Sequence, residues 1–135
     1  MAEGKEVVVI DGANVAYEER SAGGKPKLSN LLRVRSELEG RGLEAVIIVD
    51  ASLKYDIDDQ SQLETLIQSQ QVRQVPAGTD ADYFIIQLAD QLGARVVTND
   101  RYRDYLEQYP WVSDRRLPYM IVKGEVVLYE EEGRG

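Results

Sequence analysis

The stretch VVVIDGANVAY, residues 7–17, decides the fold of this chain. Four apolar residues run without a break into Asp11, which predicts a strand that is buried on both faces and ends on a carboxylate. Further apolar strands are predicted at residues 43–50, 72–75 and 94–100. An acid at the end of a buried strand needs an explanation, because an unpaired buried charge is costly.

Segments with the apolar spacing of helices alternate with these strands. They cover residues 28–42, 58–71, 79–93 and 101–109. Residues 119–129 predict a hairpin that turns at Lys123 and Gly124. This alternation predicts an α/β fold with a central, mostly parallel sheet, helices on both faces and a C-terminal hairpin. With 135 residues and no linker-like segment, we expect a single domain over residues 1–135.

The composition restricts the chemistry. The chain has no Cys and no His, which excludes disulfides, thiolate or histidine catalysis, and zinc sites built from these residues. The net charge of −8 argues against a simple nucleic-acid-binding surface unless acids gather around a cation. Neither a secretory signal nor an apolar run of about 18 residues is found, so we expect no membrane segment and a cytoplasmic location.

Acids follow three of the predicted strands, and parallel strands end at one edge of a sheet. The helix predicted from residue 79 begins at the same edge. The acids expected there are Asp11, Asp50, Asp80, Asp82, Asp100 and Asp104. Such a cluster repels itself and requires a cation, and oxygen ligands alone favour Mg²⁺, or Mn²⁺ in its place.

Local roles are the alternative for several of these acids. Asp80, Asp82 and Asp100 could cap helices, and Asp50 could begin a turn, so whether Asp50 or Asp80 joins the site is left open. Two other enzyme classes that begin with an acid after the first strand fit less well. A haloacid-dehalogenase phosphatase needs a second Asp where Ala13 stands. A response-regulator receiver has paired acids after the first strand, whereas here Gly12 follows Asp11.

Four stretches carry a resemblance that covers nearly the whole chain. They are VVVIDGANVA (7–16), TDADYFIIQLA (79–89), VVTNDRYRDY (96–105) and RRLPYMIVKGEVVL (115–128). Together they resemble the NYN/PIN-like ribonuclease domain of the Regnase (MCPIP) family. The resemblance implies a Rossmann-like PIN fold and Mg²⁺-dependent endonucleolytic cleavage of single-stranded or looped RNA.

The resemblance also assigns residues. The four catalytic, metal-holding acids are Asp11, Asp82, Asp100 and Asp104. Asp11 and Asp100 are expected to hold Mg²⁺ directly, while Asp82 and Asp104 hold waters or a second ion. The family has a tandem Asp pair before the third predicted helix. Here its first member falls on Ala81, with Asp80 one residue early.

RNA contacts are expected from polar and basic residues near these motifs. Asn14 and Asn99 are expected to orient the carboxylates and approach the substrate. The basic candidates are Arg101, Arg103, Lys25 with Arg20 and Lys27, and Arg115 with Arg116. Tyr102 could stack on a base, as could Trp111, although core packing is the stronger expectation for Trp111.

The sequence therefore predicts a Mg²⁺-dependent endoribonuclease in which metal-activated water attacks the phosphodiester. The chain lacks the Cys-His zinc finger of the animal members, and we expect a stand-alone, microbial-type NYN nuclease. Two alternatives remain: a structure-specific DNA nuclease of the same fold and a non-catalytic RNA-binding module. Whether the partner is RNA alone, and whether the chain forms a homodimer, are left open.

Overall fold

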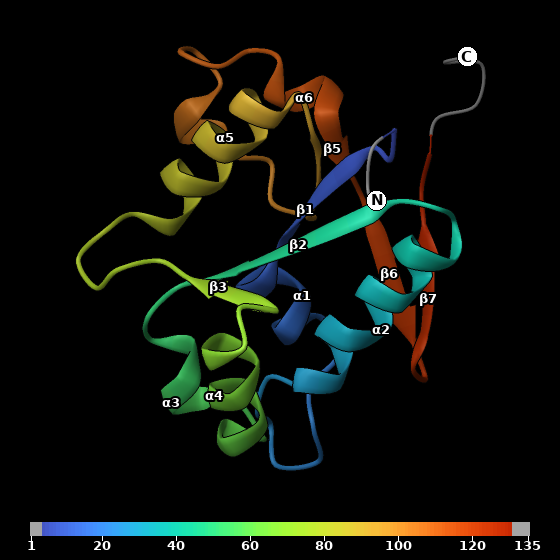
Figure 1. The fold of residues 1–135 in the computed structure, drawn as a ribbon, viewed down its shortest axis with the longest axis vertical. Coiled ribbons are helices and arrows are strands. Elements are labelled where there is room, and N and C mark those ends of the chain that lie inside the picture. Colours follow the sequence, from blue (N-terminus) through green and yellow to red (C-terminus); the bar gives the residue numbers. More distant parts are fainter. Residues whose placement is uncertain (1–3, 131–135) are drawn as a thin grey trace.

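The computed structural model describes residues 4–130, and its centre is a five-stranded parallel sheet (Figure 1). The strand order is β3-β2-β1-β4-β5, so the sequence order reverses direction beside β1. The strands are β1 (Val7–Asp11), β2 (Glu44–Val49), β3 (Val72–Gln74), β4 (Arg95–Val97) and β5 (Arg116–Leu117). Ligands of open α/β sheets bind beyond the carboxyl ends of the strands at such a reversal, here between β1 and β4.

Helices cover both faces of the sheet, as expected. They are α1 (Gly12–Glu18), α2 (Leu28–Gly40), α3 (Leu53–Asp56), α4 (Gln60–Gln68), α5 (Ala81–Leu92), α6 (Val112–Arg115) and the 3₁₀ turn η1 (Arg103–Tyr105). Core residues of α1 to α4 pack together with the hairpin on one face, and those of α5 and α6 pack on the other. Figure 1 shows α5 and α6 on one side of the sheet, with α2 and the hairpin on the other.

The position of β1 at the centre of the sheet explains its unbroken apolar sequence. Val8 and Ile10 point into the core beneath α1 and α2, whereas Val9 points into the core beneath α5. All three side chains are completely buried. A strand that is covered on both faces cannot alternate apolar with polar residues, so the α/β prediction is confirmed in its main feature.

The C-terminal hairpin is confirmed, with β6 (Tyr119–Val122) paired antiparallel to β7 (Glu125–Leu128). Its turn residues Lys123 and Gly124 both have positive φ, 51° and 81°, as the commonest tight hairpin turn requires. Two side chains fasten this turn to the helical layer. Glu19 accepts a bond from the Lys123 N–H at 2.9 Å, and Arg33 donates to the Gly124 carbonyl at 2.8 Å.

A buried asparagine closes the C-terminal end of α1. The Asn30 side chain is fully buried, and its Nδ2 donates to the carbonyl oxygens of Val15, Ala16 and Glu19 at 3.1, 3.0 and 2.8 Å. These carbonyls belong to the last turn of a helix, where backbone partners run out. The Asn30 side chain, which belongs to α2, therefore supplies hydrogen bonds that the end of α1 lacks.

The structure differs from the predicted elements at short segments. Helices α1, α3 and α6 and strand β5 were not expected from the sequence. The helix predicted over residues 101–109 is reduced to η1. Within residues 4–130, no helix combines the length and apolar character needed to cross a bilayer.

Candidate active site

Asp11 ends the central strand and at the same time begins the first helix. Its Oδ1 accepts the backbone N–H of Asn14 at 3.4 Å, so the carboxylate is the N-cap of α1. The following residue must be glycine, because a Cβ on Gly12 would lie 2.5 Å from the Ile48 carbonyl oxygen. The sequence DGAN thus places a helix start close against β2 and holds the acid at the sheet edge.

Asp11 is 5% exposed and has two hydroxyl partners. Its Oδ2 accepts bonds from Thr98 Oγ1 at 2.9 Å and from the Tyr102 hydroxyl at 2.6 Å. Burial raises the pKa of Asp11 above its ordinary value, and the two hydroxyls act in the opposite direction. Burial beside Asp11 also raises the pKa of Tyr102, so this phenol stays protonated and donates.

The role expected for Tyr102 is therefore wrong. Its side chain is 2% exposed and packs in the core beneath α5, so its ring cannot stack on an RNA base. Neither Thr98 nor the hydroxyl of Tyr102 was expected to serve the site. The only sequence signal was a polar Thr98 ending an apolar strand, directly before the Asn-Asp pair.

Asp100 follows β4 in a turn built by the same residues. Its N–H donates to Thr98 Oγ1 at 3.0 Å, and its Oδ1 accepts the N–H of Tyr102 at 2.8 Å. Its charge contributes to raising the pKa of Asp11, so the two carboxylates lie within electrostatic reach of each other. The acids at the ends of β1 and β4 therefore lie at the same edge of the sheet and share hydrogen-bond partners.

Asp82, in the first turn of α5, lies close enough to Asp11 and Asp100 for their charges to affect its pKa. Partial burial is the main reason that its pKa rises to about 6, and the charges of Asp11 and Asp100 add to the rise. Asp80 and Asp50 contribute less. Acids from three chain segments thus lie within electrostatic range of one another, and a bound cation would offset their repulsion.

A hollow of about 390 Å³ lies at this edge of the sheet. It is lined by Asp82, Asn99, Asp100, Arg101, Tyr102, Arg103, Asp104 and Tyr105. Three of the four predicted acids therefore share one open surface. Asp11 does not line the hollow, and its buried carboxylate bonds to the hydroxyl of Tyr102, which does.

These carboxylates suit a hard cation by their chemistry. All supply oxygen ligands, and the charges of Asp11 and Asp100 add to the effect of burial in raising the pKa of Asp82. Among residues 4–130, however, no group of three acids is arranged to hold a metal ion directly. Binding such an ion would therefore require the exposed carboxylates to adjust, or waters to complete the ligand set.

Asp80 and Asp50, the two acids that were left open, have local partners. Asp80 caps α5, with Oδ1 accepting the Asp82 N–H at 3.0 Å, and its other oxygen accepts the Tyr105 hydroxyl. That hydroxyl bond lowers the pKa of Asp80 and raises the pKa of Tyr105 to about 12. Asp50 accepts a bond from the Ser52 hydroxyl in the turn after β2.

Asn14 and Asn99 connect the site to the hairpin. Asn14 Oδ1 accepts the N–H of Asn99 at 3.0 Å and the hydroxyl of Tyr119 at 2.7 Å. The Asn99 side chain exchanges bonds with the backbone of Tyr119, at 3.0 and 3.1 Å. In the described part of the chain, neither side-chain amide bonds to the four acids, contrary to the orienting role expected. Their contact with substrate stays a prediction.

The predicted basic residues divide into two groups. Arg101 and Arg103 are exposed and line the hollow beside the acids. Arg116 does not line this hollow, and its Nη1 donates to the Thr98 carbonyl at 3.4 Å. Burial, followed by the nearby charge of Arg101, lowers the pKa of Arg116. Arg101 and Arg103 therefore place positive charge beside the acids that line the hollow.

The hollow is likewise not lined by Arg115, Lys25, Arg20 or Lys27. The Arg115 guanidinium stacks over the Trp111 ring at 4.4 Å and its Nη1 approaches the Ala89 carbonyl at 3.5 Å, so it packs on the α5 side. Trp111 is partly buried in that core, as expected. Lys25 is exposed in the loop between α1 and α2. Contact of these basic residues with RNA stays a prediction.

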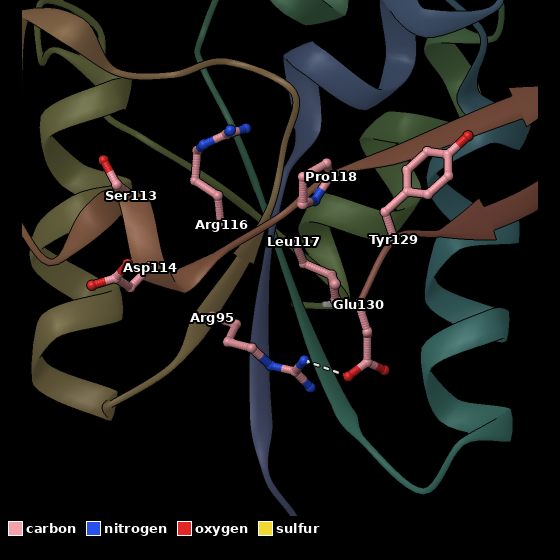
Figure 2. A pocket seen from close by; sticks show the side chains of 8 residues that line it. All are labelled: Arg95, Ser113, Asp114, Arg116, Leu117, Pro118, Tyr129 and Glu130. Carbon is pink, nitrogen blue, oxygen red and sulfur yellow. Dashed lines mark hydrogen bonds and ion pairs between the residues drawn. The ribbon is translucent and has the colours of Figure 1, made fainter. Parts of the chain in front are cut away.

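A second hollow, of about 550 Å³, lies at the β5 edge of the sheet (Figure 2). It is lined by Arg95, Ser113, Asp114, Arg116, Leu117, Pro118, Tyr129 and Glu130. Arg95 pairs with Glu130 there at 3.0 Å, and Figure 2 shows the Arg116 side chain pointing away from Arg95. None of the four predicted acids lines it, so it is separate from the candidate active site.

The reversed strand order and the acids at its carboxyl edge define an α/β domain with an acidic site, and the comparisons identify its family. The chain belongs to the family of Zc3h12a-like ribonuclease NYN domains, whose model matches residues 4–135. No curated protein matches this sequence.

Solved structures of nuclear protein-only RNase P 2 (PRORP2) from Arabidopsis thaliana share the fold. One is 24% identical over 95% of this chain, with a TM-score of 0.73. Another is 25% identical over 96% of this chain, with a TM-score of 0.72. This chain spans 30% of the length of each of these two structures. The likeness therefore concerns one part of those proteins, and it bears out the predicted Rossmann-like NYN/PIN fold.

Proposed function

We propose that this chain is a Mg²⁺-dependent endoribonuclease that hydrolyses phosphodiester bonds in single-stranded or looped RNA. The observation that carries the proposal is the hollow at the carboxyl edge of the sheet, where Asp82, Asp100 and Asp104 lie together beside two exposed arginines. Carboxylates that repel one another without a cation are costly to keep unless the ion is used. Membership in a family of ribonuclease domains makes RNA the substrate of choice.

Asp11, Asp82, Asp100 and Asp104 are the residues that would hold the ion, and Mn²⁺ would serve as well. When bound, the ion supplies activation of water and neutralisation of charge at the scissile phosphate. Asp82 carries its proton below about pH 6 and releases it above. The full negative charge for holding a cation is therefore present near neutral pH.

Arg101 and Arg103 are the groups that we assign to the RNA backbone. Both are exposed at the rim of the hollow, where phosphates would have to pass to approach the acids. The chain as a whole carries a charge of −8, so its attraction for RNA must be local. Two guanidinium groups beside the acids supply that local attraction without any general basic surface.

Cleavage of matched RNA and DNA oligonucleotides, single-stranded and stem-loop, tests this function with Mg²⁺, Mn²⁺ or EDTA. We expect RNA cleavage with either metal and none with EDTA. Asp11→Asn should abolish cleavage, whereas Asp90→Asn, an exposed acid at the far end of α5, should cleave like the wild type. Circular dichroism should show that both variants are folded.

Each alternative predicts a different result in the same experiment. Cleavage of DNA but not RNA would identify a DNA nuclease of this fold. RNA binding without cleavage under any metal condition would identify a non-catalytic binding module. Cleavage that persists in EDTA, or in Asp11→Asn, would refute the metal mechanism.

A further inference from the structure

Tyr102 has an unusual backbone conformation at the centre of the candidate site. Its φ is 50°, in the left-handed region that residues with a side chain rarely adopt. Its side chain is nevertheless 2% exposed and packs beneath α5. Such a conformation costs free energy and persists where surrounding contacts impose it.

The contacts that impose it reach two acids from opposite ends of the same residue. The Tyr102 hydroxyl donates to Asp11 Oδ2 at 2.6 Å, and its backbone N–H donates to Asp100 Oδ1 at 2.8 Å. Hydrogen bonds to ionised acceptors are shorter and stronger than those between neutral groups. The left-handed backbone turns the ring back toward β1 while the N–H still faces Asp100.

Thr98 makes a second connection between the same two acids. Its Oγ1 donates to Asp11 Oδ2 at 2.9 Å and accepts the Asp100 N–H at 3.0 Å. Oδ2 of Asp11 therefore has two hydroxyl donors. Among residues 4–130, Oδ1 accepts only the longer 3.4 Å bond from Asn14, so it retains acceptor capacity.

We propose that Tyr102 is a positioning residue that fixes the carboxylates of Asp11 and Asp100 relative to each other, so that both acids could serve in holding the metal ion. This inference rests on the proposed metal-dependent function. Tyr102 does not touch substrate in this scheme. Groups that hold metal-ligating carboxylates commonly affect metal affinity or activity by about 10- to 100-fold when they are removed.

A purely structural role is the competing explanation, because the ring also fills the core beneath α5. Tyr102→Phe separates the two, since it keeps the ring and removes only the hydroxyl. A structural role predicts at most a change in melting temperature. A positioning role predicts weaker binding of the ion itself, which can be measured without RNA.

The experiment is a calorimetric titration of the protein with Mn²⁺ in the absence of RNA. We expect Tyr102→Phe to bind Mn²⁺ about 10-fold or more weakly than the wild type. The matched control is Tyr17→Phe, which also removes a tyrosine hydroxyl bonded to a carboxylate, that of Asp56 at 3.3 Å. This control lies outside the four acids and should bind Mn²⁺ like the wild type.

Substitutions at Thr98 keep the proposal testable if Tyr102→Phe fails to fold. Thr98→Val removes the second hydroxyl on Oδ2 and should weaken Mn²⁺ binding, whereas Thr98→Ser retains it and should restore binding. Wild-type Mn²⁺ affinity in a folded Tyr102→Phe, or in Thr98→Val if Tyr102→Phe is unfolded, would overturn the proposal.

Failure of the proposed function gives a different pattern. A wild-type protein that binds Mn²⁺ and loses affinity in Tyr102→Phe, but cleaves no RNA, would refute the nuclease activity and leave the positioning role standing. A wild-type protein that binds no Mn²⁺ would overturn both.

Discussion

Replacing Asp82 by Asn should stabilise the metal-free protein and remove part of its pH dependence. The pKa of Asp82 is raised from 3.8 to about 6 in the folded chain, first by burial and then by Asp11 and Asp100. Between these values the folded state binds more protons than the unfolded state. Stability therefore falls as the pH rises from about 4 to about 6, and the penalty persists at higher pH.

The magnitude follows from the shift. About two pKa units correspond to about 3 kcal/mol at 1.36 kcal/mol per unit, and solvent screening of this half-exposed group reduces that to about 1.5 kcal/mol. Asn loses the favourable interaction of a carboxylate with the first turn of α5, about 0.5 kcal/mol. The net gain at pH 7 is about 1 kcal/mol, or about 3–5 °C in melting temperature.

Thermal unfolding in EDTA from pH 4 to 8 measures this effect. Asp90→Asn, on the exposed C-terminal part of the same helix, is the control and should keep the wild-type slope between pH 5 and 7. Added Mg²⁺ should raise the melting temperature of the wild type more than that of Asp82→Asn. Equal slopes for Asp82→Asn and the wild type would show that the carboxylates do not repel one another here.

Three further substitutions test other parts of the structure. Gly12→Ala should destabilise the chain by about 1–3 kcal/mol in urea denaturation, because the new Cβ meets the Ile48 carbonyl, and an unchanged midpoint would contradict that close approach. Asn30→Ala should cost about 2–4 kcal/mol by the same measurement, since three carbonyls lose the Asn30 donor, although that of Ala16 keeps the Lys27 N–H. Arg103→Ala should lower the salt dependence of RNA affinity, measured with Ca²⁺ to prevent cleavage, by about one unit of slope. An unchanged slope with reduced cleavage would instead make Arg103 an internal partner of a neighbouring acid.

The long apolar strands and the hairpin could be predicted because their signals are local. Strands β1 and β2 are covered on both faces, so nearly every residue in them is apolar. The hairpin turn carries Gly124 where positive φ is required. The location of the strand-end acids at one edge could be predicted from one further rule, that parallel strands end at a common edge of the sheet.

The short elements depend on distant partners and could not be predicted. Helix α1 ends on the side chain of Asn30, which belongs to the next helix. Strand β5 has two residues and pairs only with β4. The helix expected over residues 101–109 is broken at its start because Tyr102 adopts a left-handed conformation to reach Asp11.

The hydroxyl partners of Asp11 lie far from it in the sequence, and this separation affects when the site can form during synthesis. Thr98 and Tyr102 are 87 and 91 residues away from the acid that they hold. During synthesis, β1 and β2 can leave the ribosome and pair long before either hydroxyl exists. A nascent chain shorter than about 100 residues has Asp11 in place but lacks both groups that fix it and the motif that supplies Asp100. The arrangement around Asp11 can consequently form only after the segment that carries Thr98, Asp100 and Tyr102 has been synthesised.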